Sequence, residues 1–195
     1  LFCVLYMKIL YFHGFASSGT SGTVETLRNA LPEDEIIAPD IPMSPAEALP
    51  MLRALCEQEQ PDLIIGTSMG GMYAQQMFGY RRICVNPAFN MSKMGSLKTG
   101  VHKYHNRRQD NAKEFRVTKD TMHEYAQMER LQFKGITAFD KENCIGLFGI
   151  NDKVVNTYDV FRKYYPNAIR FEGEHQLNDK VIRKVLLPLI KERFR

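Results

Sequence analysis

The sequence GTSMG at residues 66–70 follows a short apolar segment, residues 63–65, and precedes a segment of helical character. The pattern G-x-S-x-G between a strand and a helix is typical of a nucleophilic serine on a sharp turn, where Gly66 and Gly70 let the flanking elements approach closely. A serine hydroxyl becomes an effective nucleophile only when a base accepts its proton. Ser68 is therefore a candidate nucleophile, and a base and an orienting acid are expected elsewhere in the chain.

The candidate base is His175, because in sites of this kind the partners follow in the order serine, acid, histidine. Among the five histidines, only His175 follows the last expected strand, residues 168–171. His102 and His105 are spaced as H-x-x-H, but no carboxylate or cysteine pattern accompanies them, so no metal site is expected. The other two histidines are assigned to a loop and to a helix surface: His13 and His123.

The candidate acid is Asp152, which comes directly after the expected strand at residues 144–149. Such an acid holds the imidazole in one tautomer and stabilises the imidazolium that forms during the reaction. Asp140 precedes this strand and Asp159 lies within the next expected helix, so neither is placed at the required edge. An alternative purpose for Asp152 is to cap a helix that begins at residues 153–155.

A third requirement is a pair of N–H donors for a negatively charged oxygen. His13 and Gly14 follow the first expected strand, where sites of this type place one donor. The backbone N–H groups of Phe15 and Met69 are therefore the expected oxyanion donors. His13 itself is expected to shape the loop rather than to act as a base.

Positioning these residues requires a sheet whose strands all end at the same edge. Short apolar segments alternate with helical patterns, which favours an α/β fold with a doubly wound, mainly parallel sheet. Catalytic groups in such sheets gather at the carboxyl ends of the strands. The six expected strands are residues 8–12, 36–38, 63–66, 82–85, 144–149 and 168–171.

Residues 88–141 interrupt this alternation and are too long for an ordinary loop. The spacing of apolar residues predicts a helix over 118–131, which starts at Thr118 or at Thr121. We expect residues 88–141 to form a helical cap or lid over the pocket of a single domain, 1–195; a surface excursion without this purpose is the alternative. Residues 91–141 hold 11 Lys and Arg against 6 Asp and Glu, so the positive charge of the chain is concentrated there.

Composition excludes several classes of partner. The 195 residues are 44% hydrophobic and 25% charged, an ordinary globular balance. No apolar segment approaches the roughly 18 residues that cross a bilayer. Residues 1–6 lack the features of a signal peptide, and they are either native or a misplaced start before Met7. The cysteines show no C-x-x-C spacing and are expected to be reduced, so we expect a cytoplasmic protein without a membrane partner.

The motifs together resemble a known family. YFHGFASS at residues 11–18, GTSMGG at 66–71, FGIND at 148–152 and GEH at 173–175 are similar to the α/β-hydrolase superfamily, and within it to the small bacterial YqiA/YcfP-like esterases. That family begins almost directly with the oxyanion strand, which implies a reduced hydrolase fold. The resemblance implies esterase or thioesterase activity without a cofactor and does not extend to residues 90–139.

The expected reaction is therefore acyl transfer to water by Ser68, with His175 as base and Asp152 as orienting acid. The substrate is a small ester or thioester, and the basic segment favours an anionic one. Nucleic acid is not expected, since the segment lacks interleaved aromatic residues and a known module. A ligand-sensing protein on a hydrolase fold, and a triad hydrolase of amide or C–C bonds, remain alternatives; the sequence indicates no oligomeric state.

Overall fold

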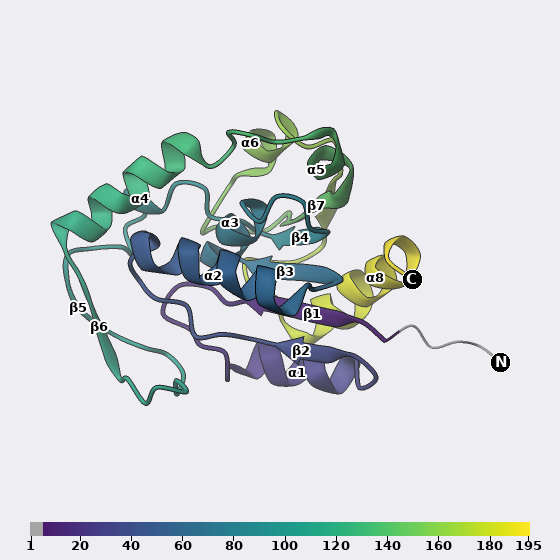
Figure 1. Ribbon diagram of the computed structural model, residues 1–195, viewed down its shortest axis with the longest axis horizontal. Helices are drawn as coiled ribbons and strands as arrows, with labels where there is room; N and C mark the ends of the chain where they lie inside the picture. The colour runs from purple at the N-terminus through teal and green to yellow at the C-terminus, as the bar shows by residue number, and fades with distance from the viewer. Residues whose placement is uncertain (1–5) are drawn as a thin grey trace.

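The computed structural model describes residues 6–195 and contains one six-stranded parallel sheet (Figure 1). The strands lie in the order β2-β1-β3-β4-β7-β8, with the chain passing from the middle of the sheet to each edge. Each strand begins and ends within about a residue of its predicted segment, so the predicted doubly wound parallel sheet is confirmed. The alternatives for residues 1–6, native residues or a misplaced start, concern positions that, except for Tyr6, lie outside the described residues. The strands are β1 (Lys8–Phe12), β2 (Glu35–Ile37), β3 (Leu63–Thr67), β4 (Arg82–Val85), β7 (Cys144–Gly149) and β8 (Ala168–Phe171).

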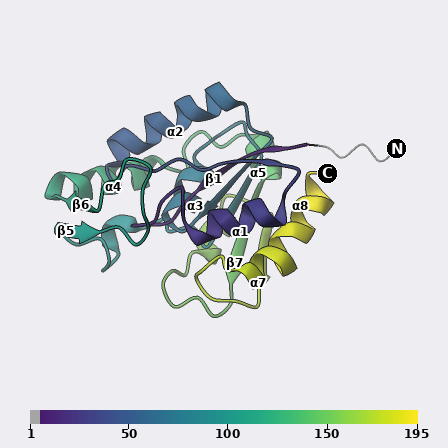
Figure 2. The same ribbon diagram turned by 90° about the horizontal axis from the view of Figure 1, so that it is seen from below.

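Helices cover both faces of the sheet, as Figure 2 shows edge-on. Successive side chains of a strand point to opposite faces, and β1 illustrates the rule. Ile9 and Tyr11 belong to one apolar core, while Leu10 and Phe12 belong to the other. The first core is completed by α1 (Gly22–Ala30), α7 (Asp179–Val181), the π-helical turn η2 (Ile182–Leu186) and α8 (Leu187–Arg193). The second is completed by α2 (Pro45–Glu59), α3 (Met69–Gln75), α4 (Lys119–Leu131) and α6 (Tyr158–Arg162).

The insertion at residues 88–141 contains more than the predicted helix. The predicted helix is α4, which begins at Lys119 with Thr118 as its N-cap, and the Thr118 hydroxyl accepts a hydrogen bond from the Thr121 N–H at 3.1 Å. An antiparallel pair of strands before it was not predicted, because each strand has only four residues and lacks a run of β-branched side chains. This β5–β6 hairpin projects beside α4 at one end of the molecule (Figure 1). The insertion comprises η1 (Met91–Lys93), β5 (Gly100–Lys103), β6 (Glu114–Val117), α4 and the greater part of α5 (Ala138–Asn143).

A buried ion pair closes the amino end of the sheet, opposite the candidate site. Arg82 at the start of β4 lies 2.9 Å from Asp140, and neither side chain is exposed. Burial alone would raise the pKa of the Asp140 carboxyl, but hydrogen bonds from Thr137 and Gly79 and the charge of Arg82 lower it overall. Asp140 is thus committed to this pair.

Within residues 6–195 no helix combines the length and the apolar character needed to span a membrane.

Candidate active site

Ser68 occupies the sharp turn between β3 and α3. Its backbone has φ 54° and ψ −116°, a strained conformation that a side-chain-bearing residue adopts at a cost of about 1–3 kcal/mol. Two hydrogen bonds fix the turn against the neighbouring strand: the Ser68 N–H donates to Val85 O at 2.9 Å, and the Ala88 N–H donates to Ser68 O at 3.0 Å. The turn therefore projects the Ser68 hydroxyl from the carboxyl edge of the sheet.

The two glycines of the motif permit this turn through close backbone contact. A Cβ on Gly66 would lie 2.2 Å from the carbonyl oxygen of Gly70, and a Cβ on Gly70 would lie 2.0 Å from that of Phe12. Neither distance is compatible with a side chain. The helix that starts after Ser68 therefore packs directly on the ends of β1 and β3, as the sequence pattern predicts.

His175 lies in the loop between β8 and α7, and its ring meets the Ser68 hydroxyl. Its Nε2 is 3.0 Å from Ser68 Oγ, and its Nδ1 is 2.7 Å from Asp152 Oδ2. A carboxylate oxygen accepts hydrogen bonds, so Nδ1 carries the ring hydrogen and Nε2 is left to accept the serine proton. The structure thus brings together the three side chains that were named from the sequence.

Asp152 uses both of its carboxylate oxygens. While Oδ2 accepts from His175, Oδ1 accepts from the N–H groups of Val154 at 2.7 Å and Val155 at 3.1 Å. These residues form a turn, and the next helix, α6, begins only at Tyr158. The alternative purpose, a cap on a helix at 153–155, is therefore wrong, although Asp152 does stabilise the local turn. With 3% of its side chain exposed, the carboxylate is held rigidly behind the imidazole.

Asn86 is a supporting residue that the sequence did not single out. It follows β4 with a left-handed φ of 43° and is buried. Its Nδ2 donates to the carbonyl oxygens of Glu174 and His175, each at 3.0 Å, and its Oδ1 accepts from the Gly149 N–H at 2.8 Å. One amide thereby ties the histidine loop to the strand that precedes Asp152. The only sequence signal was an asparagine at the carboxyl end of a central strand.

The loop after β1 lies directly beside Ser68. A Cβ on Gly14 would be 3.5 Å from Ser68 Cβ, and Phe15 lines the same cavity as Ser68. Met69 is the first residue of α3, whose opening N–H groups have no partner inside the helix. Within residues 6–195, neither the Phe15 N–H nor the Met69 N–H donates to a backbone acceptor outside its own element. Both expected donors thus remain available next to Ser68.

His13 shapes this loop and does not reach Ser68. Its Nε2 accepts a hydrogen bond from the Ile41 N–H at 3.0 Å, and its Nδ1 lies 2.8 Å from Gly14 O. A backbone N–H can only donate, so Nε2 is unprotonated and Nδ1–H donates to Gly14. Burial lowers the pKa of His13 to about 4, and the nearby charge of Arg108 acts in the same direction. His13 is therefore a neutral structural residue.

A cavity of about 690 Å³ opens in front of Ser68 and His175. Eight of its twenty lining residues carry hydroxyl groups, and no Lys or Arg of the described chain is among the twenty. Deep in its wall, the Tyr11 hydroxyl is 3.0 Å from Thr67 Oγ1. The cavity is therefore rich in neutral hydrogen-bonding groups. The hydroxyl-bearing residues are Tyr11, Ser17, Ser21, Thr23, Thr26, Thr67, Ser68 and Ser96.

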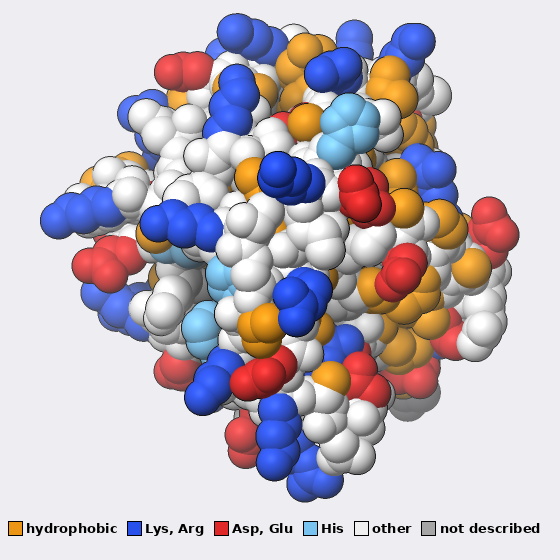
Figure 3. Space-filling model, turned by 90° about the vertical axis from the view of Figure 1, so that its left-hand side faces the viewer, with side chains coloured by type: hydrophobic (Ala, Val, Ile, Leu, Met, Phe, Trp, Pro, Cys, Tyr) orange, Lys and Arg blue, Asp and Glu red, His pale blue; other side chains and the backbone are white. Residues whose placement is uncertain are grey.

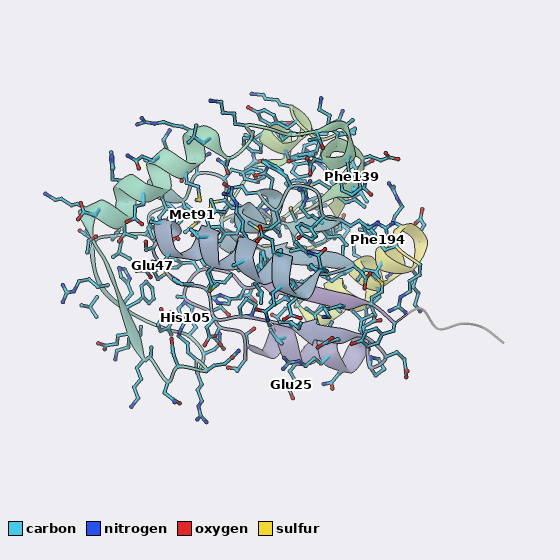
Figure 4. The ribbon with its side chains drawn as sticks, in the orientation of Figure 1. Glu25, Glu47, Met91, His105, Phe139 and Phe194 are labelled. Atoms are coloured by element: carbon cyan, nitrogen blue, oxygen red, sulfur yellow. The ribbon has the colours of Figure 1, made fainter. Side chains whose placement is uncertain are left out.

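The insertion reaches this cavity through the connection between β5 and β6. The His105 N–H donates to Ala16 O at 2.7 Å, Asn106 Nδ2 donates to Ser17 Oγ at 3.1 Å, and Ser18 Oγ donates to Arg107 O at 2.8 Å. Figure 4 shows His105 between the hairpin and the body of the molecule. His105 and Asn106 both line the cavity. The insertion is thus hydrogen-bonded to the loop that carries Phe15.

The other histidines and the basic residues lie away from the reacting groups. His102 stacks on Phe115 with ring centroids 5.3 Å apart, and His123 lies 2.8 Å from Gln127 on α4. Figure 3 shows the end of the molecule that carries the hairpin and α4, with Lys and Arg side chains spread over it and acidic ones among them. The basic residues counted in the insertion are therefore absent from the described cavity wall.

Solved structures share this arrangement of strands and helices. Est1E from Butyrivibrio proteoclasticus, solved with ferulic acid bound, is 12% identical with a TM-score of 0.69, over 96% of this chain and 89% of that one. A thioesterase domain from the curacin biosynthetic pathway is 15% identical with a TM-score of 0.60, over 96% and 92%. A soluble variant of monoglyceride lipase from Saccharomyces cerevisiae is 12% identical with a TM-score of 0.64, over 95% and 85%.

At these identities the likeness demonstrates the α/β-hydrolase fold. The family comparison is more specific, because one family model matches residues 8–186, from the first strand to the closing helices. That match agrees with the resemblance to YqiA/YcfP-like proteins that the motifs indicate. The chain belongs to the family described as Uncharacterised protein family UPF0227.

Proposed function

We propose that the protein is a serine hydrolase that cleaves carboxylic esters or thioesters through an acyl-enzyme on Ser68. The observation that carries the proposal is the continuous relay from Ser68 Oγ to His175 Nε2 at 3.0 Å and from His175 Nδ1 to Asp152 Oδ2 at 2.7 Å. The strained backbone of Ser68 supports it, since such strain concentrates at functional sites. Esterase, thioesterase and lipase structures with the same fold add support by analogy.

The geometry suits a two-step acyl transfer. Ser68 Oγ attacks the carbonyl carbon while its proton passes to His175 Nε2, and Asp152 stabilises the imidazolium. The carbonyl oxygen becomes negatively charged and accepts hydrogen bonds from the N–H groups of Phe15 and Met69. His175 then gives the proton to the leaving oxygen or sulfur as the bond to carbon breaks. In the second step, water loses a proton to His175 and attacks the acyl-enzyme, which releases the acid and restores Ser68.

The insertion, residues 88–141, acts in this proposal as a cap. Its link to the loop of Phe15 supports a cap that is anchored at one side of the cavity, through His105 N–H and Asn106. The insertion is also fixed to α3, because Tyr125 of α4 directs its hydroxyl to Met69 Sδ at 3.3 Å in the core. Substrate selection would then depend on the insertion as well as on the hydrolase core.

Labelling with a fluorophosphonate probe tests the nucleophile directly. The intact protein should become covalently labelled, whereas Ser68→Ala and His175→Ala should not. His123→Ala is the matched control, because His123 lies on α4 outside the cavity and its loss should leave labelling intact. Circular dichroism would establish that every variant is folded.

The outcomes separate the alternatives. Absence of labelling in folded intact protein would contradict the proposal and favour a ligand-sensing protein. If labelling occurs, a screen of aryl esters, thioesters and anilides identifies the bond that is cleaved. Cleavage of anilides without cleavage of esters would replace ester hydrolysis by amide hydrolysis.

A further inference from the structure

The N-terminus of α1 opens into the same cavity as Ser68. Ser21, Gly22 and Thr23 all line the cavity, and α1 runs for nine residues from Gly22. The first N–H groups of a helix have no acceptor within the helix. Within residues 6–195, the N–H groups of Gly22 and Thr23 donate to no backbone acceptor outside α1 either. Two backbone donors at the positive end of a helix dipole therefore lie at the cavity wall.

Ser21 adds a hydroxyl without a hydrogen-bond partner at the same place. It occupies the N-cap position, where a serine hydroxyl ordinarily accepts a hydrogen bond from the second or third N–H of the helix. Here the side chain makes no such bond, and its Oγ has no hydrogen-bond partner in the described chain although the residue is only 5% exposed. Buried polar atoms without a partner are uncommon and call for an explanation. Because Ser21 lines the cavity, this unpartnered hydroxyl lies beside the two free N–H groups of α1.

This corner and the reacting atoms belong to one cavity, and Tyr11 and Thr67 connect them. The Tyr11 hydroxyl is 3.0 Å from Thr67 Oγ1, next to Ser68, and hydrogen bonds from both Thr67 and Thr23 partly offset the rise in the Tyr11 pKa that burial causes. The wall beside α1 is shared with the residues that follow His175: Gln176, Leu177 and Asn178. In the proposed reaction His175 protonates the leaving group, and we therefore assign this part of the cavity to the leaving-group side.

We propose that Ser21, Gly22 and Thr23 form a subsite for an anionic oxygen group, a carboxylate or phosphate, on the leaving alcohol or thiol of the substrate. This inference rests on the proposed function for the identity of the leaving-group side. Helix N-termini with free N–H groups bind such anions readily. The only carboxylate lining the described cavity, Asp179, is exposed and paired with Arg183 at 2.8 Å, so it does not fill the subsite.

Binding can be measured without turnover. The ¹⁵N-labelled protein is titrated with inorganic phosphate, and in parallel with benzoate, against sodium chloride of equal ionic strength. Saturable shifts of the Gly22 and Thr23 amide signals that chloride does not reproduce are expected, and the two anions show which oxygen group binds more tightly. Absence of such shifts with both anions would overturn the subsite, whatever the protein hydrolyses.

A matched pair of variants tests whether the subsite takes part in hydrolysis. Gly22→Pro removes one N–H donor, while Gly22→Ala keeps it. Proline suits the first position of a helix, Ser21 before it is extended with ψ 159°, and a Cβ on Gly22 meets nothing within 4 Å. The substrates are 4-acetoxybenzoate and its methyl ester, which present the same acetyl group on leaving groups with and without a carboxylate.

The measured quantity is the ratio of kcat/KM for the carboxylate substrate to that for the methyl ester. Gly22→Pro should lower this ratio about fivefold to tenfold relative to Gly22→Ala, as expected for one lost donor to an anion. Equal ratios in folded variants would overturn the inference. Failure of the intact protein to react with fluorophosphonate would instead remove the proposed function, and the phosphate titration would still report on the subsite.

Discussion

Acid should destabilise this fold through His13, the residue that holds the loop of Gly14 and Phe15. His13 is buried, and its Nε2 accepts the Ile41 N–H at 3.0 Å. Protonation at Nε2 would place the new ring hydrogen against the Ile41 amide hydrogen and break that bond. Burial, with a smaller contribution from Arg108, lowers the pKa of His13 to about 4, while the hydrogen bond to Gly14 and the charge of Asp40 act in the opposite direction.

The sign and size of the effect follow from proton linkage. The pKa of His13 is about 4 in the folded state against 6.5 for an ordinary histidine, so the unfolded chain binds more protons between these values. The stabilisation is complete above about pH 6.5 and is lost as the pH falls toward about 4. It amounts to about 3 kcal/mol in full, and about 2 kcal/mol of it should already be lost at about pH 5.

Urea unfolding at about pH 7 and about pH 5 measures this loss, with His13→Gln as the control. The glutamine Oε1 can accept the Ile41 N–H from a position near that of Nε2, and glutamine does not titrate. Carboxylates elsewhere titrate alike in both proteins and cancel from the comparison. Between the two pH values, the free energy of unfolding of the intact protein should fall by about 2 kcal/mol more than that of His13→Gln. An equal fall in both proteins would refute the reasoning.

Three further substitutions probe the site. Asp152→Asn should keep the fold but lower the rate of fluorophosphonate labelling by about 10⁴-fold, because the imidazole is then held in the wrong tautomer; unchanged labelling would remove Asp152 from the relay. Gly70→Ala places a Cβ 2.0 Å from a carbonyl oxygen of β1 and should cost about 4 kcal/mol or more, or prevent folding, as urea unfolding or soluble yield would show. Asn86→Ala releases the carbonyl oxygens of the histidine loop, so labelling should slow by about tenfold or more, with about 1–3 kcal/mol lost from stability.

The sheet could be predicted from the sequence because its strands are buried on both faces. Such strands appear as short continuous apolar segments, and helices of recognisable period separate them. The hairpin β5–β6 carries no such signal. Val101 is exposed and the hairpin is stabilised by contacts made far along the chain, including the bond from His105 N–H to Ala16 O. Contacts of that kind depend on the finished fold and leave no local pattern.

The same distinction applies to the site. Ser68, His175 and Asp152 were expected to meet because the hydrolase fold places such side chains after particular strands and in one order along the chain. Asn86 makes three hydrogen bonds to two other segments, but no spacing rule points to it. The pairing of Tyr11 with Thr67 is hidden for the same reason, since both residues look like ordinary members of strands.

The cavity also changes the physical basis for expecting an anionic substrate. The expectation of an anionic substrate rested on the basic surplus of the insertion, yet no Lys or Arg of the described chain lines the cavity. Charges outside the wall attract anions toward the cavity and raise their encounter rate, an effect that salt screens. Discrimination after encounter must then come from neutral donors in the wall, and besides the oxyanion donors Phe15 and Met69 our proposal assigns this to the N–H groups of Gly22 and Thr23. Attraction toward the cavity and selection within it are therefore assigned to different parts of the molecule, the insertion and the start of α1.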